Sequence, residues 1–212
     1  MPRLKPISRK EAPPAVIAVY DSVFGERDPV AEPGTSTGSP GDWWTTMAIV
    51  PEILESFVEQ FAVFNSKSRE LPARLRELAL CRAGFIGGSK FVYSQHSKVA
   101  RAIGVKKEQV DAIPAWPLSD DLEHADRCVL QYVDELLLQS GRVQETTFNA
   151  LRKILSEPAI LELSVAAASY HLHGILCRAL RIEFDDAEEW VTEVPGPPNF
   201  KDEDLLSLVA QE

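Results

Sequence analysis

Residues 74–104 read RLRELALCRAGFIGGSKFVYSQHSKVARAIG. The pair Gly87-Gly88 separates two apolar runs of helical spacing, which predicts two helices joined by a tight turn. Glu77 lies early in the first run and His96 lies in the middle of the second. When such helices pack antiparallel, a carboxylate can orient an imidazole and the imidazole can move a proton. The stretch therefore predicts a helical hairpin that carries a Glu–His pair.

Helical spacing extends over most of the chain, and no stretch shows the period of two that is typical of strands. We expect further helices at 13–24, 51–65, 106–113, 119–140, 144–155 and 158–182. Ser89 and Ser119 are the predicted N-caps of the helices that follow them. The helix at 158–182 is apolar nearly all round, so we expect it to be central and buried. The fold class is therefore all-α.

Changes in composition divide the chain into three parts. Residues 1–42 hold one helix and a Gly/Pro-rich loop at 25–42, residues 43–182 hold the helical domain, and residues 183–212 form an acidic and then Pro-rich extension. Asp42 is the predicted N-cap of the segment that begins with Trp43 and Trp44. The two tryptophans either pack the loop onto the domain or form a pocket wall.

The net charge of −10 makes nucleic acid and anionic membrane surfaces unexpected partners. No uninterrupted apolar run reaches the length of a membrane span, and we expect a cytoplasmic protein. The three cysteines, Cys81, Cys128 and Cys177, include no Cys-x-x-Cys pair, which favours reduced thiols over disulfides.

The hairpin resembles the carboxymuconolactone decarboxylase and alkylhydroperoxidase-D-like (AhpD-like) family. The resemblance is carried by Glu77, the apolar run 78–86, the Gly-Gly turn, His96 and the following residues 100–105, and it extends over roughly residues 43–182. It implies an all-α AhpD-like helical domain, here with an N-terminal arm and a C-terminal extension. It also implies a homo-oligomer with pockets near the subunit contacts.

The chain departs from both branches of this family. In the peroxidase branch the glutamate precedes a Cys-x-x-Cys-x-x-x-His element, and the two cysteine positions are here Ser89 and Val92. In the decarboxylase branch Tyr-Glu-Trp precedes the histidine, and here Phe91, Val92 and Tyr93 stand there. The resemblance therefore implies the fold and leaves the reaction open.

Three residues are the predicted catalytic group. His96 is the expected general acid and base, Glu77 its orienting carboxylate, and Tyr93 a phenol one helical turn before His96 that could stabilise negative charge. Each has a simpler alternative: a surface histidine, a glutamate paired with Arg74 or Arg82, and a tyrosine in the core.

Further residues are predicted to line a substrate pocket: Phe91, Ser89, Trp43, Trp44, Tyr170 and His171. The simpler alternative for each is packing, or for Ser89 the N-cap. His171 and His173 are two residues apart and therefore point to different sides of a helix, so they cannot both bind one metal ion. No metal or phosphate motif is present, and we expect no cofactor and no metal.

These observations lead to one principal hypothesis and two alternatives. The first is a cofactor-independent acid/base enzyme, of decarboxylase, isomerase or lyase type, acting on a small organic acid or lactone. One alternative is a divergent alkylhydroperoxidase or peroxiredoxin-like redox protein that uses Cys81. The other is a non-catalytic binder of small molecules.

Overall fold

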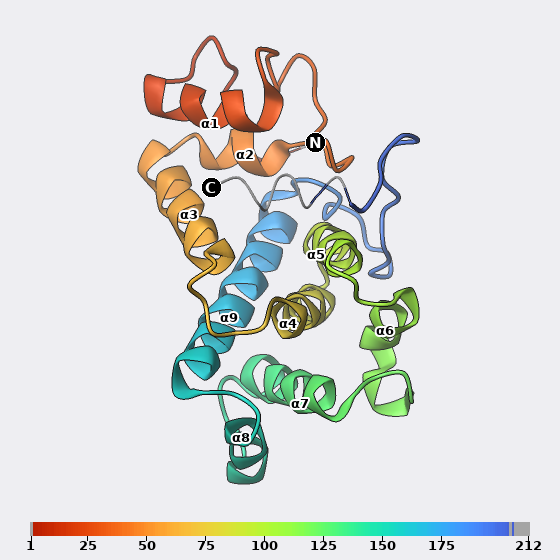
Figure 1. Ribbon diagram of the computed structural model, residues 1–212. Helices are drawn as coiled ribbons and strands as arrows, with labels where there is room; N and C mark the ends of the chain where they lie inside the picture. Colours follow the sequence, from red (N-terminus) through yellow and green to blue (C-terminus); the bar gives the residue numbers. More distant parts are fainter. Residues whose placement is uncertain (1, 204, 206–212) are drawn as a thin grey trace.

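The computed structural model describes residues 2–203 and 205, and every regular element within them is a helix (Figure 1), so the all-α prediction is confirmed. The elements are α1 (Pro14–Phe24), α2 (Asp42–Met47), α3 (Pro51–Asn65), α4 (Ala73–Ile86), α5 (Lys90–Ala102), α6 (Lys107–Ala112), the 3₁₀ helix η1 (Ile113–Leu118), α7 (His124–Leu138), α8 (Glu145–Arg152) and α9 (Glu157–Leu180).

The predicted hairpin is formed by α4 and α5, which lie side by side in the middle of the molecule (Figure 1). Gly88 has a φ of 67°, a left-handed conformation that glycine adopts without strain, and it reverses the chain. Ser89 then caps α5, because its Oγ accepts a hydrogen bond from the Val92 amide at 3.1 Å. The helices approach most closely at Gly84, where a Cβ would lie 2.7 Å from the backbone nitrogen of Tyr93.

Helix α4 is the most enclosed element, with every residue from Leu75 to Gly84 buried. It packs against α5, α7 and α9. Two ion pairs fasten it to α7: Arg74 binds the fully buried Asp126, and Arg82 binds Asp134 at 2.6 Å. Because each charge has an oppositely charged partner, the enclosed helix can carry these arginines without leaving a bare charge in the core.

Helix α9 also packs against several neighbours, namely α4, α5, α7 and α8. Its inward face, which includes Leu163 and Ala167, belongs to the largest core cluster. The helix is long and apolar enough to cross a membrane by length and composition, but this buried face accounts for part of that apolarity. The expected packing against several neighbours is confirmed, while large apolar side chains on the outward face are exposed.

The N-terminal helices α1 and α2 cover one end of the molecule (Figure 1). Asp42, the predicted N-cap of α2, is instead its first residue, and Gly41 holds the cap position with a φ of 93°. The acceptor comes from the far end of the chain. The Glu183 carboxylate accepts hydrogen bonds from the amides of Trp43 at 2.7 Å and Gly41 at 3.1 Å. Burial raises the pKa of Glu183 to about 7.

The predicted start of a helix at Ser119 is also wrong. Residues 119–123 form a turn in which the Ser119 hydroxyl bonds to Asp121, and α7 begins at His124. The cap is a reciprocal box in which Glu123 and Asp126 accept each other's backbone amides. Glu123 occupies the N-cap position of α7, where Ser, Thr, Asp or Asn is usual. The nearest such residue with a helix start signal is Ser119, which is why the sequence predicts the cap there.

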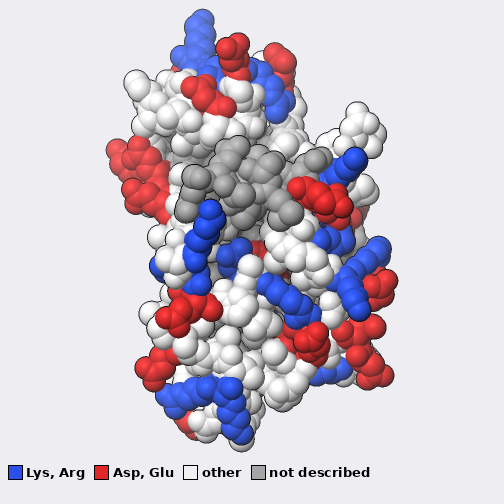
Figure 2. Space-filling model, in the orientation of Figure 1, with Lys and Arg blue, Asp and Glu red and all other residues white. Residues whose placement is uncertain are grey.

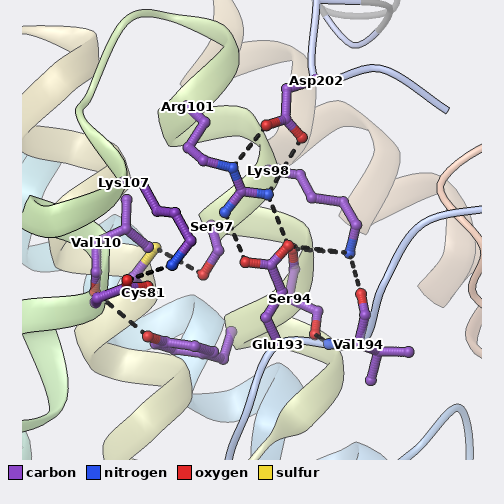
Figure 3. Close-up of polar contacts among 12 residues, drawn as sticks. Cys81, Ser94, Ser97, Lys98, Arg101, Lys107, Val110, Glu193, Val194 and Asp202 are labelled. Carbon is purple, nitrogen blue, oxygen red and sulfur yellow. Dashed lines mark hydrogen bonds and ion pairs between the residues drawn. The ribbon is translucent and has the colours of Figure 1, made fainter.

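The C-terminal extension runs over the hairpin from Glu183 onward, and the end of the segment predicted at 183–212 lies outside the described residues. Figure 3 shows how it is fastened to α5. The Arg101 guanidinium binds the carboxylates of Glu193 and Asp202, each at 2.6 Å. Lys98 is 1% exposed, and its ammonium donates to the Val194 carbonyl at 2.7 Å. The extension is therefore held to the domain by charge-assisted bonds.

Replacing Gly84 by alanine tests the close contact between α4 and α5. In an exposed helix this change stabilises by about 1 kcal/mol, because alanine is the better helix former. Here the added methyl meets backbone atoms of α5, so we expect a loss of about 1–3 kcal/mol. Urea unfolding followed by circular dichroism distinguishes stabilisation from destabilisation, because the change in unfolding free energy has opposite signs. A stabilised variant would contradict the observed packing.

Candidate functional site

Glu77 of α4 and His96 of α5 meet inside the hairpin. The Glu77 Oε2 atom lies 2.7 Å from Nδ1 of His96, and Oε1 accepts a hydrogen bond from Nε of Arg76 at 2.9 Å. Arg76 also donates to the carbonyl of Phe64 at the end of α3. The neighbours predicted as alternative partners, Arg74 and Arg82, bind α7 instead. Glu77 thus points inward, to the imidazole.

The charge state of the carboxylate follows from its surroundings. Burial of Glu77 acts to raise its pKa, but His96 and Arg76 together outweigh burial and hold the pKa below its ordinary value. An ionised carboxylate only accepts hydrogen bonds, so Nδ1 of His96 carries the proton and Nε2 is the nitrogen left for chemistry. The His96 side chain is 12% exposed, so the pair is screened from most solvent.

An aromatic side chain of α9 contacts the imidazole, and aromatic side chains of α3 pack behind it. The Tyr170 ring meets the His96 ring edge-on, with centroids 4.3 Å apart. Behind Tyr170 lie Phe61 at 6.1 Å, Phe64 at 6.3 Å and His173 at 5.4 Å, measured between ring centroids. Burial raises the pKa of the Tyr170 phenol, so this group stays protonated and able to donate a hydrogen bond.

His173 is a second imidazole at this site. It is 2% exposed and lies among Trp43, Phe57 and Phe61, with ring centroids 4.7–5.4 Å away. Neither ring nitrogen has a hydrogen-bond partner among the residues that the structure describes. Burial, with a smaller contribution from His96, lowers the pKa of His173 to about 4. The ring is therefore neutral at pH 7. Burying its two nitrogens in apolar surroundings without hydrogen-bond partners costs folding free energy.

The spacing of His173 from Tyr170 is a sequence signal that indicates its place at the site. His171 and His173 are close in sequence but point to different sides of the helix. Helical geometry instead pairs residues three or four apart, so Tyr170 and His173 share a face, and that face looks toward His96. His171 lies beside the hairpin turn, where its Nδ1 would be 3.3 Å from a Cβ at Gly87.

Tyr93 does not face the pair. Its hydroxyl donates to the carbonyl of Val110 in α6 at 3.4 Å, and its ring packs against Phe85. It belongs to the core cluster between the hairpin and α6. The contacts match the simpler alternative of core packing.

Ser89 and Phe91 lie under the C-terminal extension. The Ser89 hydroxyl donates to Oδ2 of Asp185 at 2.5 Å, and the Phe91 amide donates to Oδ1 of the same residue at 3.3 Å. Ser89 is fully buried, and Val92 is 2% exposed. Both positions that hold cysteine in the peroxidase branch are therefore enclosed.

The tryptophans differ in their distance from the pair. Trp43 is buried and touches the ring of His173, so it forms part of the aromatic surroundings of the site. Trp44 packs edge-on against Trp43, with centroids 5.0 Å apart, and lies farther out. Of the predicted pocket residues, Tyr170 contacts the ring of His96 directly, whereas Trp43 is connected to it only through His173 and Tyr170.

Cys81 follows Glu77 by one helical turn but faces the core. Its Sγ lies 3.9 Å from the hydroxyl of Ser97. Burial, reinforced by the nearby charge of Glu77, raises the pKa of this thiol. All three cysteines are free thiols. A thiol with a raised pKa is a weak nucleophile, because the thiolate is the reactive form.

A small hollow of about 10 Å³ lies beside Arg76, lined by Phe64, Arg69, Leu71, Arg76, Glu162 and Ala166. Its volume matches about one water molecule, so it is too small for an organic substrate. Within residues 2–203 and 205, no group of three or more His, Cys, Asp or Glu side chains is arranged to hold a metal ion.

Comparison with known structures gives several neighbours. A variant of the debrominase Bmp8 in complex with 2,3,4-tribromopyrrole aligns with a TM-score of 0.65 at 18% identity, covering 86% of this chain and 92% of that one. A peroxidase-related protein from Ralstonia eutropha JMP134, described as an alkylhydroperoxidase AhpD core, aligns with a TM-score of 0.62 at 18% identity. The alignment covers 84% of this chain and 93% of that one.

A third structure is an Agrobacterium tumefaciens protein of unknown function, described as a candidate antioxidant defence protein AhpD. It aligns with a TM-score of 0.58 at 22% identity and covers 64% of this chain and 92% of that one. At these identities the likeness concerns the fold. No curated protein matches the chain.

The carboxymuconolactone decarboxylase family model matches residues 51–135, the segment that contains α3, the α4–α5 hairpin and most of α7. Over this segment the chain matches the carboxymuconolactone decarboxylase family, and its fold is the AhpD-like fold of its structural neighbours.

Proposed function

We propose that this protein is a cofactor-independent enzyme that moves a proton on a small organic substrate. The observation that carries the proposal is the 2.7 Å contact between Glu77 and His96, with Arg76 holding the carboxylate from the other side. An imidazole whose Nδ1–H is bound to a carboxylate is held in one orientation, and its Nε2 is left to take and return a proton. Both are requirements of a general acid/base.

The proton balance fits isomerisation and decarboxylation. In isomerisation, Nε2 of His96 takes a proton from a carbon next to a carbonyl, and the resulting imidazolium returns it to a different carbon. In decarboxylation, an imidazolium protonates the carbon that releases CO₂. The negative charge of Glu77 stabilises the imidazolium in both reactions. The ring of Tyr170 contacts the imidazole and carries a hydroxyl that could donate to a substrate oxygen.

The surroundings favour a small, flat substrate. The ring of Tyr170 contacts the imidazole, and the rings of Phe61 and Phe64 pack against Tyr170. Such apolar surroundings limit the access of water, which strengthens electrostatic interactions. A ligand that reaches Nε2 must displace part of this aromatic layer. That a structural neighbour of this fold holds 2,3,4-tribromopyrrole, a planar ring, supports the same class of ligand. Small lactones and unsaturated organic acids are of this shape.

The redox alternative depends on a reactive thiol. Cys81 is buried, its pKa is raised, and its near polar neighbour is the hydroxyl of Ser97. The neighbours described as peroxidase-related share the fold at low identity. The state of the thiol therefore favours acid/base chemistry over peroxide reduction.

Replacing His96 by alanine or Glu77 by glutamine should remove turnover. We expect hydrogen–deuterium exchange at the carbon acid to fall at least about 100-fold for His96→Ala, since a positioned base contributes that much or more. The loss for Glu77→Gln should be at least about tenfold, because a neutral amide no longer stabilises the imidazolium. The assay is ¹H NMR in D₂O with a panel of small lactones and unsaturated or β-keto carboxylic acids.

The matched control is His124→Ala, which removes a surface histidine at the start of α7 and should leave exchange unchanged. Circular dichroism verifies that each variant is folded. If wild type and both site variants exchange equally, the proposal is wrong. Thermal stabilisation by a panel compound without any exchange or product would instead identify a binder.

Cys81→Ala tests the redox alternative independently. We expect acid/base turnover within about threefold of wild type, because a free buried cysteine acts chiefly as packing. Consumption of an organic hydroperoxide in the presence of dithiothreitol is the second measurement. If wild type reduces the hydroperoxide and Cys81→Ala does not, the result favours the redox alternative.

The pH dependence of stability tests the state of His173. Its pKa is about 4 in the folded protein, below the ordinary value of 6.5. Between these values the unfolded chain binds the proton and the folded chain does not, so acidification destabilises the protein. His173→Phe removes this contribution, and its unfolding free energy should fall less than that of wild type from pH 7 to pH 4.5. Urea titrations at both pH values measure the unfolding free energies. An equal fall in the two proteins would contradict the prediction.

A further inference from the structure

Two buried polar rings without a protein partner meet near the Glu77–His96 pair. His173 of α9 and Trp43 of α2 are each 2% exposed, and their ring centroids lie 5.4 Å apart. Neither nitrogen of the imidazole, nor Nε1 of the indole, has a hydrogen-bond partner among the residues that the structure describes. Each unpaired group costs folding free energy. Two of them in contact, on helices far apart in the sequence, indicate a place where the polar partner is a ligand.

The two rings suit an oxygen atom of a ligand. The indole N–H of Trp43 only donates a hydrogen bond. Burial lowers the pKa of His173 to about 4, so at pH 7 its neutral ring has one N–H donor and one nitrogen that accepts. A carbonyl oxygen can accept from both N–H groups, and a hydroxyl can in addition donate to the bare nitrogen.

The surroundings of these donors suit a flat ring. The rings of Phe57, Phe61 and Tyr170 lie 4.7–5.4 Å from the ring of His173, measured between centroids. Aromatic faces of this kind pack well against planar molecules. The Tyr170 ring also lies 4.3 Å from that of His96. Because Tyr170 contacts both imidazoles, a molecule of the size of one ring can reach from His173 to His96.

The charges around the site disfavour an ionised ligand. Burial is the main cause of the raised pKa of the Tyr170 hydroxyl, and Glu77 raises it further by more than Arg76 lowers it. An anion would therefore be repelled here. A cation would have no acceptor for the N–H of Trp43. On the face that Figure 2 draws, basic and acidic side chains are interspersed, so its described residues form no strongly basic patch for an anion either.

We propose that His173 and Trp43 form an oxygen-binding subsite for an uncharged, planar cyclic ligand, whose carbonyl oxygen accepts the N–H groups of both rings. The subsite deepens the acid/base function proposed above and rests on it for one point, the placement of the ligand's acidic carbon at Nε2 of His96. When that carbon gives its proton to Nε2, the electron pair moves onto the oxygen, where the two N–H groups stabilise the enolate. The proton then returns to carbon.

Entry of a ligand requires part of the aromatic layer to move, because His173 is buried. Trp43 lies on α2, which has six residues, and a helix of this length depends on tertiary contacts for its stability. Movement of α2 opens the subsite, and its return brings the indole N–H to the ligand.

The first experiment measures binding by NMR with three probes that share one aromatic ring. Protein labelled with ¹⁵N on histidine and tryptophan gives ring signals, and those of His173 and Trp43 are identified with His173→Phe and Trp43→Phe. Phenol is uncharged at pH 7 and resembles an enol, so it should shift both sets of signals. Toluene, which lacks the oxygen, should bind at least about fivefold more weakly. Benzoate, which is anionic, should also bind more weakly than phenol.

The second experiment compares variants. His173→Phe and Trp43→Phe should each weaken phenol binding about fivefold and leave toluene binding nearly unchanged, since each removes a polar group and keeps a ring. His173→Asn retains a donor and an acceptor and should keep the preference for phenol over toluene. The matched control is His171→Phe. It also removes a buried nitrogen without a partner, but beside the hairpin turn, and should bind phenol like wild type.

These measurements separate the subsite from general packing. A purely structural role of His173 would change the binding of phenol and toluene together. The proposal is wrong if phenol leaves the signals of His173 and Trp43 unchanged, or if His173→Phe binds phenol as tightly as wild type. Equal binding of phenol and toluene shows an apolar pocket without a polar subsite, and benzoate binding as tight as that of phenol contradicts the charge argument.

The exchange assay in D₂O is a separate result. Phenol binding at His173 in a protein without exchange activity supports the subsite and contradicts the proposed enzyme. Exchange activity in a protein whose His173 signals do not respond to phenol has the opposite meaning, because it supports acid/base chemistry at His96 and excludes the subsite.

Discussion

The buried carboxylate of Glu77 holds three helices together. An ionised carboxylate without partners in the core would cost several kcal/mol or more. Here its two oxygens bind His96 of α5 and Arg76 of α4, and Arg76 in turn binds the end of α3 through the Phe64 carbonyl. The packing of α5 and α3 on α4 therefore satisfies this charge, and the same charge orients the imidazole. The stability of the hairpin and the chemistry of the site depend on one group.

Much of this could be predicted from the sequence, because the signals are local. Helical spacing gave the helices, the Gly-Gly pair gave the turn, and Ser89 was identifiable as a cap from its place after that turn. The spacing of Glu77 and His96 within a recognisable family pattern predicted that the two would face each other, and they do.

What the sequence did not reveal depends on distant partners or on a choice between faces. Helix α5 is buried on more than one side, so helical position alone could not tell whether Tyr93 faced the site or α6. The cap of α2 comes from Glu183, far away in the chain, and no local pattern contains it. His173 differs from an ordinary core histidine because its nitrogens lack partners, and only the packed neighbours disclose this.

The carboxylate of Glu183 has a consequence for the order in which the chain can complete its fold. It closes the N-terminus of α2 from about 140 positions later in sequence. During synthesis the residues of α2 are translated long before Glu183, whose carboxylate accepts the hydrogen bonds of its first turn. A helix of this length is marginally stable without tertiary contacts. The N-terminal end of the molecule can reach its final form only once α9 has been translated and has docked. The beginning of the chain is thus among the parts that finish folding late.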